Sequence, residues 1–177
     1  MCYRNLILGF IVSLIFPALS LANMVVGPMI ERPDRVIVPL PPPAPGLAAD
    51  LRRDGVQVIQ VGDELRIVLS TDRLFRGLST TEIRPSCMYV LSKVALLLQN
   101  YCNYPIVVSG HTDNIGSDRA KFIRSQQQAE TIAGYLWSQG VGLNDMRVIG
   151  YGDTRPVSNN RTTGGQAENR RIEINIQ

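Results

Sequence analysis

The chain has 177 residues, of which 45% are hydrophobic and 19% are charged, and its formal net charge is +3. This composition is typical of a globular protein, and the length suits one folded domain after a short leader. The Lys and Arg residues are scattered along the chain, which argues against a nucleic-acid partner, since such a surface needs many cations aligned with phosphates.

Residues 1–22 have the pattern of a secretory signal peptide. A positive charge at Arg4 precedes an apolar run from Leu6 to Leu19, and small residues stand before the expected cut after Ala22. The run is shorter than the roughly 20 residues that a membrane-spanning helix needs, and it contains a proline. We therefore expect export to the periplasm, with an uncleaved membrane anchor as the alternative.

The residue after the expected cut is Asn23, and not the cysteine that would accept a lipid. Lipid anchoring is therefore not expected from this start site, although association with the outer membrane stays open. Two cysteines would remain, Cys87 and Cys102. A helix between them would hold them roughly 22 Å apart, beyond the limit of about 7 Å for a disulfide. No second pair completes a zinc site, and we expect no metal and no cofactor.

Residues 23–48 form a proline-rich spacer. Consecutive prolines favour an extended polyproline II segment, which over twenty-odd residues spans on the order of 70 Å. The alternative is a docking motif for an aromatic groove on a partner. The prolines are Pro28, Pro33, Pro39, Pro41, Pro42, Pro43 and Pro45.

Residues 49–177 are expected to form one domain, and their hydrophobic spacing predicts its elements. The predicted order is an antiparallel pair of strands, a helix, a buried strand, a second helix, a third strand, a long loop and a last strand. The first two strands are expected at 56–61 and 65–69, the two helices at 85–101 and 118–139, and the buried strand between the helices at 106–108. The third strand is expected at 146–149, the long loop at 150–171 and the last strand at 172–176. This order predicts a two-layer α/β (α+β) sandwich, with a mixed sheet and the two main helices on one face.

The second predicted helix carries an apolar stripe that is expected to face the core. The stripe consists of Phe122, Ile123, Ala129, Ile132, Ala133, Leu136 and Trp137.

The segment 110–116 is the first candidate site, because it leaves a buried strand and precedes a helix. Such a loop offers free amides to an anion, and Asp113 adds a negative charge beside Thr112, Asn114 and Gly116. The combination suits a zwitterion that has an ammonium and a carboxylate. The alternative is that Thr112 and Asp113 only cap the loop. The single histidine, His111, is expected to pack beneath it.

An enzyme is not expected from this segment. Ser109, His111 and Asp113 are strung along one backbone, and no nucleophile elbow precedes them.

The second candidate site is Asn169, Arg170 and Arg171. Two adjacent arginines entering a strand point to opposite faces, so one can brace the fold while the other lines a cleft. The sequence does not decide which arginine does which, and a solvated charge pair is the alternative.

These motifs together resemble the OmpA C-terminal family, which includes Pal and the periplasmic domain of MotB. The resemblance rests on Gly110-His111-Thr112-Asp113, Gly150-Tyr151-Gly152-Asp153 and Asn169-Arg170-Arg171-Ile172-Glu173, and it covers about residues 65–176. It implies noncovalent binding of peptidoglycan. An aspartate matching Asp113 would take the ammonium of diaminopimelate in the stem peptide, and an arginine of the following helix would take its carboxylate.

The sequence departs from the family pattern at two positions. The helix arginine falls at Gln128, and a later arginine falls at Gln166. Arg124 lies one turn before Gln128 and is the candidate to supply the missing charge. The departures leave two interpretations open, a peptidoglycan-binding module and a scaffold subunit that has lost the ligand.

A further resemblance concerns the kind of assembly. The segment Ser125-Gln126-Gln127-Gln128-Ala129-Glu130-Thr131 resembles the DotK/IcmN group of OmpA-like subunits in Dot/Icm type IVB secretion systems. It implies a protein that anchors a secretion system to the cell wall and has envelope or secretion-system proteins as partners.

Overall fold

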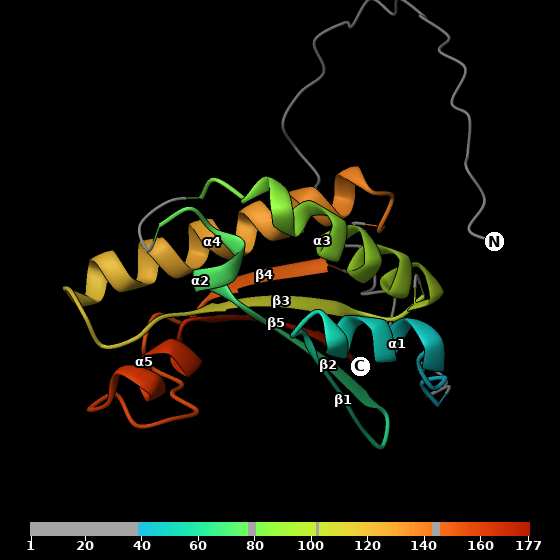
Figure 1. Ribbon diagram of the computed structural model, residues 1–177, viewed down its shortest axis with the longest axis horizontal. Coiled ribbons are helices and arrows are strands. Elements are labelled where there is room, and N and C mark those ends of the chain that lie inside the picture. The colour runs from blue at the N-terminus through green and yellow to red at the C-terminus, as the bar shows by residue number, and fades with distance from the viewer. Residues whose placement is uncertain (1–38, 78–80, 102, 143–145) are drawn as a thin grey trace, which may run out of the picture. The chain divides into compact units, whose positions relative to one another are not determined.

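The computed structural model describes residues 39–77, 81–101, 103–142 and 146–177 (Figure 1). The predicted signal peptide, most of the predicted spacer and Cys102 lie outside these ranges. Cys87 is a free thiol. No helix in the described ranges has the length and apolar character needed to span a membrane.

Five strands form one sheet, in the order β1-β2-β5-β3-β4. β3 and β4 are parallel, whereas the other neighbours are antiparallel. The predicted mixed sheet is therefore confirmed, including the antiparallel pair at its start. The strands are β1 (Gln57–Val61), β2 (Glu64–Ser70), β3 (Ile106–His111), β4 (Met146–Gly150) and β5 (Arg171–Ile176).

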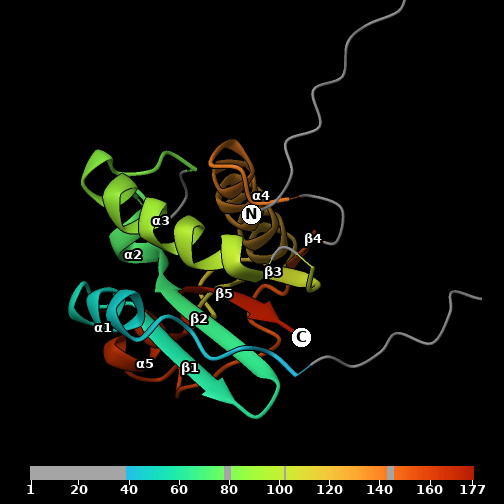
Figure 2. The ribbon, with the colours of Figure 1, turned by 90° about the vertical axis from the view of Figure 1, so that its right-hand side faces the viewer.

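The two long helices, α3 (Pro85–Leu98) and α4 (Asp118–Ser138), cover one face of the sheet, as Figures 1 and 2 show. This confirms the predicted two-layer sandwich. A 3-10 turn, η1 (Gln99–Tyr101), continues α3. Three shorter helices were not predicted: α1 (Pro45–Arg53), α2 (Thr71–Leu74) and α5 (Thr163–Asn169).

The predicted spacer ends earlier than residue 48. α1 begins at Pro45, at a position in the first helical turn where the missing N–H of proline costs nothing. Ala48 and Leu51 of α1 are buried, and Leu40 before it is also buried. Residues 39–48 therefore belong to the folded domain, because their apolar side chains pack into its core.

The core follows the register of the three central strands. Leu65, Ile176 and Ile106 form one row across β2, β5 and β3, and Ile67, Ile174 and Val108 form the next. All six side chains are at most 3% exposed. The period of two in each strand places these residues on the face covered by the helices.

The apolar stripe predicted for α4 is partly wrong. Ala129, Ile132, Ala133 and Leu136 are buried, whereas Phe122, Ile123 and Trp137 are 55%, 42% and 58% exposed. The helix contacts the sheet only along the narrow stripe that repeats every three or four residues. The three large side chains fall outside that stripe.

Candidate functional site

Glycines bring α4 into close contact with the ends of β3 and β4. A Cβ on Gly110 would lie 2.1 Å from the carbonyl oxygen of Ser125, and a Cβ on Gly150 would lie 2.5 Å from the amide of Gln126. The Ser125 hydroxyl accepts a hydrogen bond from the Gly152 amide at 2.9 Å. The loops that leave β3 and β4 are therefore fixed against the same part of α4.

Asp113 lies in the loop after β3, and its carboxylate is buried at 1% exposure. Its Oδ2 accepts a hydrogen bond from Nη1 of Arg170 at 2.6 Å, and its Oδ1 accepts one from the Ile115 amide at 3.1 Å. Arg170 also donates from Nε and Nη2 to both carboxylate oxygens of Asp72, at 2.8 and 2.7 Å. We call Asp72, Arg170 and Asp113 the carboxylate–arginine cluster.

The carboxylate–arginine cluster has two negative charges and one positive charge, so its net formal charge is −1. The hydrogen bonds from Arg170 to Asp72, and then to Asp113, raise the pKa of the guanidinium well above its usual value, against the opposing effect of burial. Each carboxylate oxygen offers two lone pairs, so Asp113 keeps acceptor capacity beyond these contacts.

The structure shows which of the two arginines contacts the candidate loop and which braces the fold. Arg170 contacts the candidate loop through Asp113, whereas Arg171 points to the other face of β5 and binds Oε1 of Glu173 at 2.7 Å. Both side chains are mostly buried, at 16% and 6% exposure, so the alternative of a solvated pair is wrong. Although burial opposes ionisation of Glu173, the hydrogen bond from Arg171 lowers its pKa.

Asn169 fixes the segment that faces the candidate loop. Its Oδ1 accepts from the amides of Val157 and Ser158 at 2.8 and 3.0 Å. Its Nδ2 donates to the Ser158 carbonyl and to Oδ1 of Asn160, both at 2.8 Å. The side chain is fully buried. Asn169 therefore has a structural role, because all its side-chain hydrogen bonds are within the protein. The sequence alone did not show whether Asn169 contacts the ligand or supports the residues that do.

The remaining residues of the candidate loop differ in exposure. Thr112 is 3% exposed, and its hydroxyl has no hydrogen-bond partner among the described residues. Asn114 and Gly116 are exposed, and Gly116 has φ of 106°, a conformation that favours glycine. Gln166 of α5 donates to Oδ1 of Asn114 at 3.4 Å and to the Asn160 carbonyl at 2.9 Å. The amide at position 166 thus links α5 to the loop.

The two α4 residues of the predicted site have different surroundings. Gln128 is 3% exposed, so its amide lies within the protein. Arg124 is half-buried, and it forms no hydrogen bond or ion pair within the part of the chain that the structure describes. Their contact with a ligand stays a prediction.

Asp72 was not predicted as part of the site. It lies in α2, 41 positions before Asp113, so no local pattern joins the two. The only signal was that the sequence has two arginines at 170 and 171, each of which needs a buried partner.

His111 packs beneath the loop, as expected. It is 3% exposed, its Nε2 lies 3.4 Å from the Ser109 hydroxyl, and its ring stacks on Tyr151 with centroids 5.3 Å apart. Burial, reinforced by the positive charge of Arg171, lowers its pKa to about 4. Across the described ranges, no group of three metal-binding side chains includes it or occurs elsewhere.

Comparison with known proteins identifies relatives of the domain. A family model described as the OmpA family matches residues 77–170. The probable lipoprotein YiaD of Escherichia coli (strain K12) is 33% identical over 126 residues, which cover 71% of this chain and 57% of YiaD. The peptidoglycan-binding protein ArfA of Mycobacterium tuberculosis is 30% identical over 133 residues, which cover 75% of this chain and 37% of ArfA. The chain thus spans between about a third and three fifths of these relatives.

Solved structures show the same fold. The cell wall anchor of the type VI secretion system (T6SS) from Pseudomonas aeruginosa superposes with a TM-score of 0.65 at 28% identity, covering 73% of this chain and 92% of the anchor. The periplasmic domain of Helicobacter pylori MotB superposes with a TM-score of 0.63 at 22% identity, covering 70% of this chain and 82% of that domain.

Proposed function

This chain belongs to the OmpA family, and we propose that it binds peptidoglycan noncovalently, through the loop 112–116 and the carboxylate–arginine cluster. The names of two relatives support the proposal, because both refer to peptidoglycan. ArfA is a peptidoglycan-binding protein, and the Brucella suis relative that is 39% identical over 87 residues is a peptidoglycan-associated lipoprotein. The function is one of binding, and the chain holds the wall without altering it.

The net negative charge of the carboxylate–arginine cluster is the observation that carries the proposal. Arg170 neutralises one of two carboxylates, and one negative charge is left next to a loop whose residues Asn114 and Gly116 are exposed. The ammonium group of a diaminopimelate stem peptide provides the matching charge. The Thr112 hydroxyl beside it is buried and has no hydrogen-bond partner among the described residues.

The carboxylate of the same ligand needs donors. We propose that Arg124, which has no ion-pair partner among the described residues, supplies the charged donor, and that the exposed amides around Asn114 and Gly116 supply neutral ones. Gln128 stands at the position of the family's arginine. A neutral amide there makes a weaker contact than a charged, bidentate arginine.

We further propose that the domain anchors an envelope assembly to the cell wall from the periplasm, and that the assembly is a type IVB (Dot/Icm) secretion system. The T6SS cell wall anchor, at 28% identity, supports the general role of holding a secretion machine. A copurification of the chain with the core subunits of its secretion complex, before and after digestion of the wall, tests the finer assignment.

A scaffold that has lost peptidoglycan binding is the second candidate. The burial of the Asp113 carboxylate, at 1% exposure with both oxygens bonded inside the protein, favours it. In that interpretation the carboxylate–arginine cluster only joins α2, the loop after β3 and the C-terminal end of α5.

A pull-down with purified sacculi separates the two candidates. We expect the wild-type chain to sediment with sacculi and Asp113→Asn to lose at least ten-fold in affinity, because the substitution removes the net negative charge while keeping the shape. Glu173→Gln is the matched control, since it neutralises another buried carboxylate that pairs with an arginine. It should bind as the wild type does. No binding by the wild type would favour the scaffold, whereas equal binding by wild type and Asp113→Asn would mean that the chain contacts the wall elsewhere and would contradict the proposed site.

A further inference from the structure

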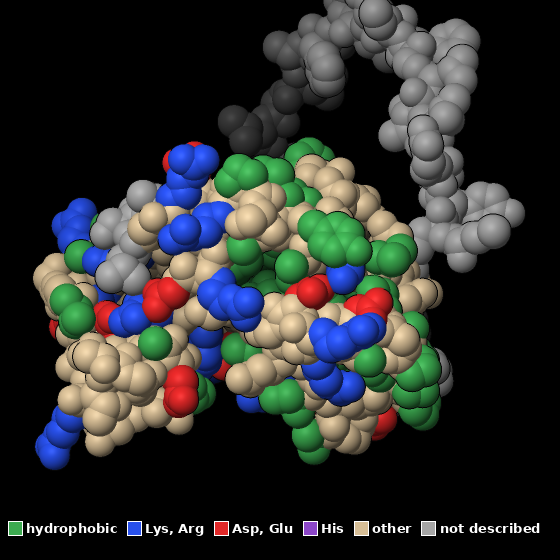
Figure 3. All heavy atoms as spheres, viewed as in Figure 1, with side chains coloured by type: hydrophobic (Ala, Val, Ile, Leu, Met, Phe, Trp, Pro, Cys, Tyr) green, Lys and Arg blue, Asp and Glu red, His purple; other side chains and the backbone are tan. Residues whose placement is uncertain are grey.

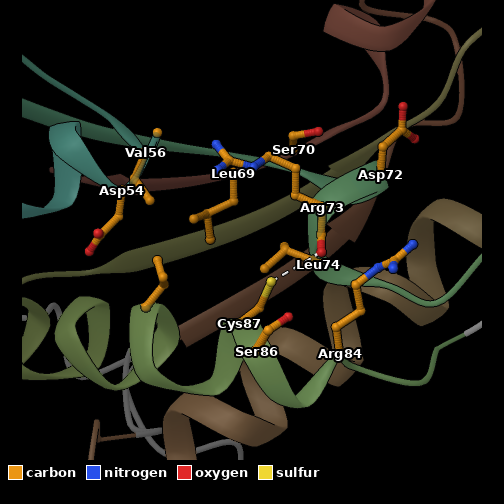
Figure 4. A pocket seen from close by; sticks show the side chains of 12 residues that line it. Asp54, Val56, Leu69, Ser70, Asp72, Arg73, Leu74, Arg84, Ser86 and Cys87 are labelled. Atoms are coloured by element: carbon orange, nitrogen blue, oxygen red, sulfur yellow. Dashed lines mark hydrogen bonds between the residues drawn. The ribbon is translucent and has the colours of Figure 1, made fainter.

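A cavity lies between α2, α3 and the turn that joins α1 to β1, and it borders the carboxylate–arginine cluster at Asp72. Its volume is about 480 Å³, and Asp54, Val56, Arg73, Arg84 and Cys87 are among the residues that line it (Figure 4). In the space-filling view it is a hollow between α2 and α3, with hydrophobic side chains at its floor and basic ones beside it (Figure 3). Much of its lining precedes residue 77, where the match to the OmpA family begins. We call it the α2–α3 cleft.

The floor of the α2–α3 cleft is apolar. Val56, Leu69 and Leu74 are each at most 4% exposed, and Val90 of α3 is half-buried beside them. The volume falls within the range of roughly 300 to 1,000 Å³ that is typical of ligand pockets. An apolar side chain entering this cleft would cover the floor and release water from it.

The acidic residues around the cleft are already neutralised. Asp54 pairs with Lys93 at 2.7 Å, and Asp72 pairs with Arg170 at 2.7 Å. Neither carboxylate therefore contributes an unbalanced negative charge to the cleft.

The basic residues around the cleft are not neutralised. Arg73 and Arg84 form no ion pair with any residue in the described ranges. The Nε of Arg84 donates a hydrogen bond to the Phe75 carbonyl at 2.7 Å. Figure 4 shows Arg84 on the side of the cleft opposite Asp54. The local surplus is two positive charges beside an apolar floor.

The Arg73 side chain packs against the turn between α1 and β1. A Cβ on Gly55 would lie 1.8 Å from Nη1 of Arg73, so the guanidinium lies directly against the Gly55 backbone. Gly55 has φ of 82°, which also favours glycine. On the opposite wall, the thiol of Cys87 donates to the Arg73 carbonyl at 3.1 Å, which ties α2 to α3.

From these observations we infer that the α2–α3 cleft docks an acidic segment of a partner polypeptide, with one apolar side chain on the floor and carboxylates at Arg73 and Arg84. An extended peptide suits the site because side chains two positions apart point to the same face, so that acidic residues two positions before and after the apolar residue can reach the two arginines. Charge complementarity selects the acidic partner, since an incoming lysine or arginine would meet two like charges.

Titration of the ¹⁵N-labelled full-length exported chain with a synthetic peptide, acetyl-Glu-Asp-Leu-Asp-Glu-amide, tests the inference by NMR. We expect saturable shifts at the amides of Gly55, Ser86 and Cys87. A peptide with Gln and Asn in place of Glu and Asp, and one with Ser in place of Leu, should each bind at least five-fold more weakly. Failure of the first peptide to bind, or equal binding by all three, overturns the inference.

A pair of double variants separates docking from general charge attraction. Arg73→Gln with Arg84→Gln should weaken peptide binding at least ten-fold, whereas Arg119→Gln with Arg147→Gln, two exposed arginines elsewhere, removes the same charge and should leave it unchanged. Equal loss in both would show unspecific attraction and overturn the inference. Shifts at the same amides with phosphatidylglycerol vesicles, but not with the peptide, would assign a lipid surface instead. Sacculus binding should be unchanged in both variants, so this test is independent of the proposed function.

Discussion

The adjacent residues Arg170 and Arg171, at the start of β5, each hold a separate cluster of buried charge. Arg170 joins Asp72 and Asp113 at the candidate site, and Arg171 joins Glu173 on the face of the sheet that α3 and α4 do not cover. Burying an ion pair costs desolvation, and the attraction between the two charges offsets that cost only when their remaining hydrogen bonds are also satisfied. Arg171 satisfies them with two backbone carbonyls, at 3.1 and 3.3 Å, so this pair braces the fold.

The sequence identified most of the candidate site but not its internal arrangement. The motif Gly110-His111-Thr112-Asp113 and the arginines were found because each stands next to a strand. The burial of Asp113 could not be predicted, because its partner Arg170 lies 57 residues away in the chain and is shared with Asp72, which lies 98 residues from Arg170. Long-range pairing of charges leaves no periodic signal in a single sequence.

His111 predicts a dependence of stability on pH. Its pKa of about 4 in the folded state lies below the ordinary value of 6.5, because burial disfavours the charged ring. The unfolded chain therefore binds more protons between these values, and stability falls as the pH drops from about 6.5 to about 4, by up to about 3 kcal/mol. Urea unfolding of wild type and His111→Asn at pH 7 and pH 4.5 measures this. If the variant lost as much stability on acidification as the wild type, His111 would not be the cause.

Asn169→Ala is expected to destabilise the domain. The substitution leaves the amides of Val157 and Ser158 without their acceptor, at a fully buried position, and unsatisfied buried groups cost about 1 to 3 kcal/mol. We expect a loss of about 2 to 3 kcal/mol in the free energy of unfolding. Asn160→Ala removes only one of the four hydrogen bonds and should cost less than about 1 kcal/mol. Equal losses would contradict the central role given to Asn169.

At the scale of elements, a helix or strand could be predicted from the sequence when it was long enough to show a clear hydrophobic period. The strands were found because alternating residues such as Ile172, Ile174 and Ile176 face one core. α1 was missed because prolines mask its start, and α2 because four residues carry no helical period. α5 contains two glycines, yet the Thr162 hydroxyl caps it by accepting from the Gly165 amide at 3.0 Å.

The close contact of α4 with β3 predicts opposite effects for two glycine substitutions. In Gly110→Ala the new methyl meets the Ser125 backbone, which cannot move without shifting the helix, so we expect a loss of at least about 1 to 3 kcal/mol. Gly134 lies in α4 with nothing within 4 Å of its ideal Cβ, and Gly134→Ala should stabilise by about 0.5 to 1 kcal/mol. Thermal unfolding of both variants measures this. If both substitutions destabilised the domain, the close contact between Gly110 and the Ser125 backbone would not explain why glycine is needed at position 110.

At the scale of the whole molecule, two neighbouring regions of the described domain differ in charge and meet at Asp72. The loop 112–116 has excess negative charge beside it, whereas the α2–α3 cleft has excess positive charge over an apolar floor. One molecule could therefore hold the ammonium of a wall peptide and an acidic partner at the same time. Such a division suits a protein that connects the wall to an assembly.

The affinity of the purified chain for a soluble muropeptide tests the central claim most directly. Calorimetric titration with a diaminopimelate-containing stem peptide should show saturable binding, which weakens at least ten-fold in Asp113→Asn and when lysine replaces diaminopimelate in the peptide. Lack of binding to the diaminopimelate peptide, or an affinity that is the same in Asp113→Asn, would contradict the account.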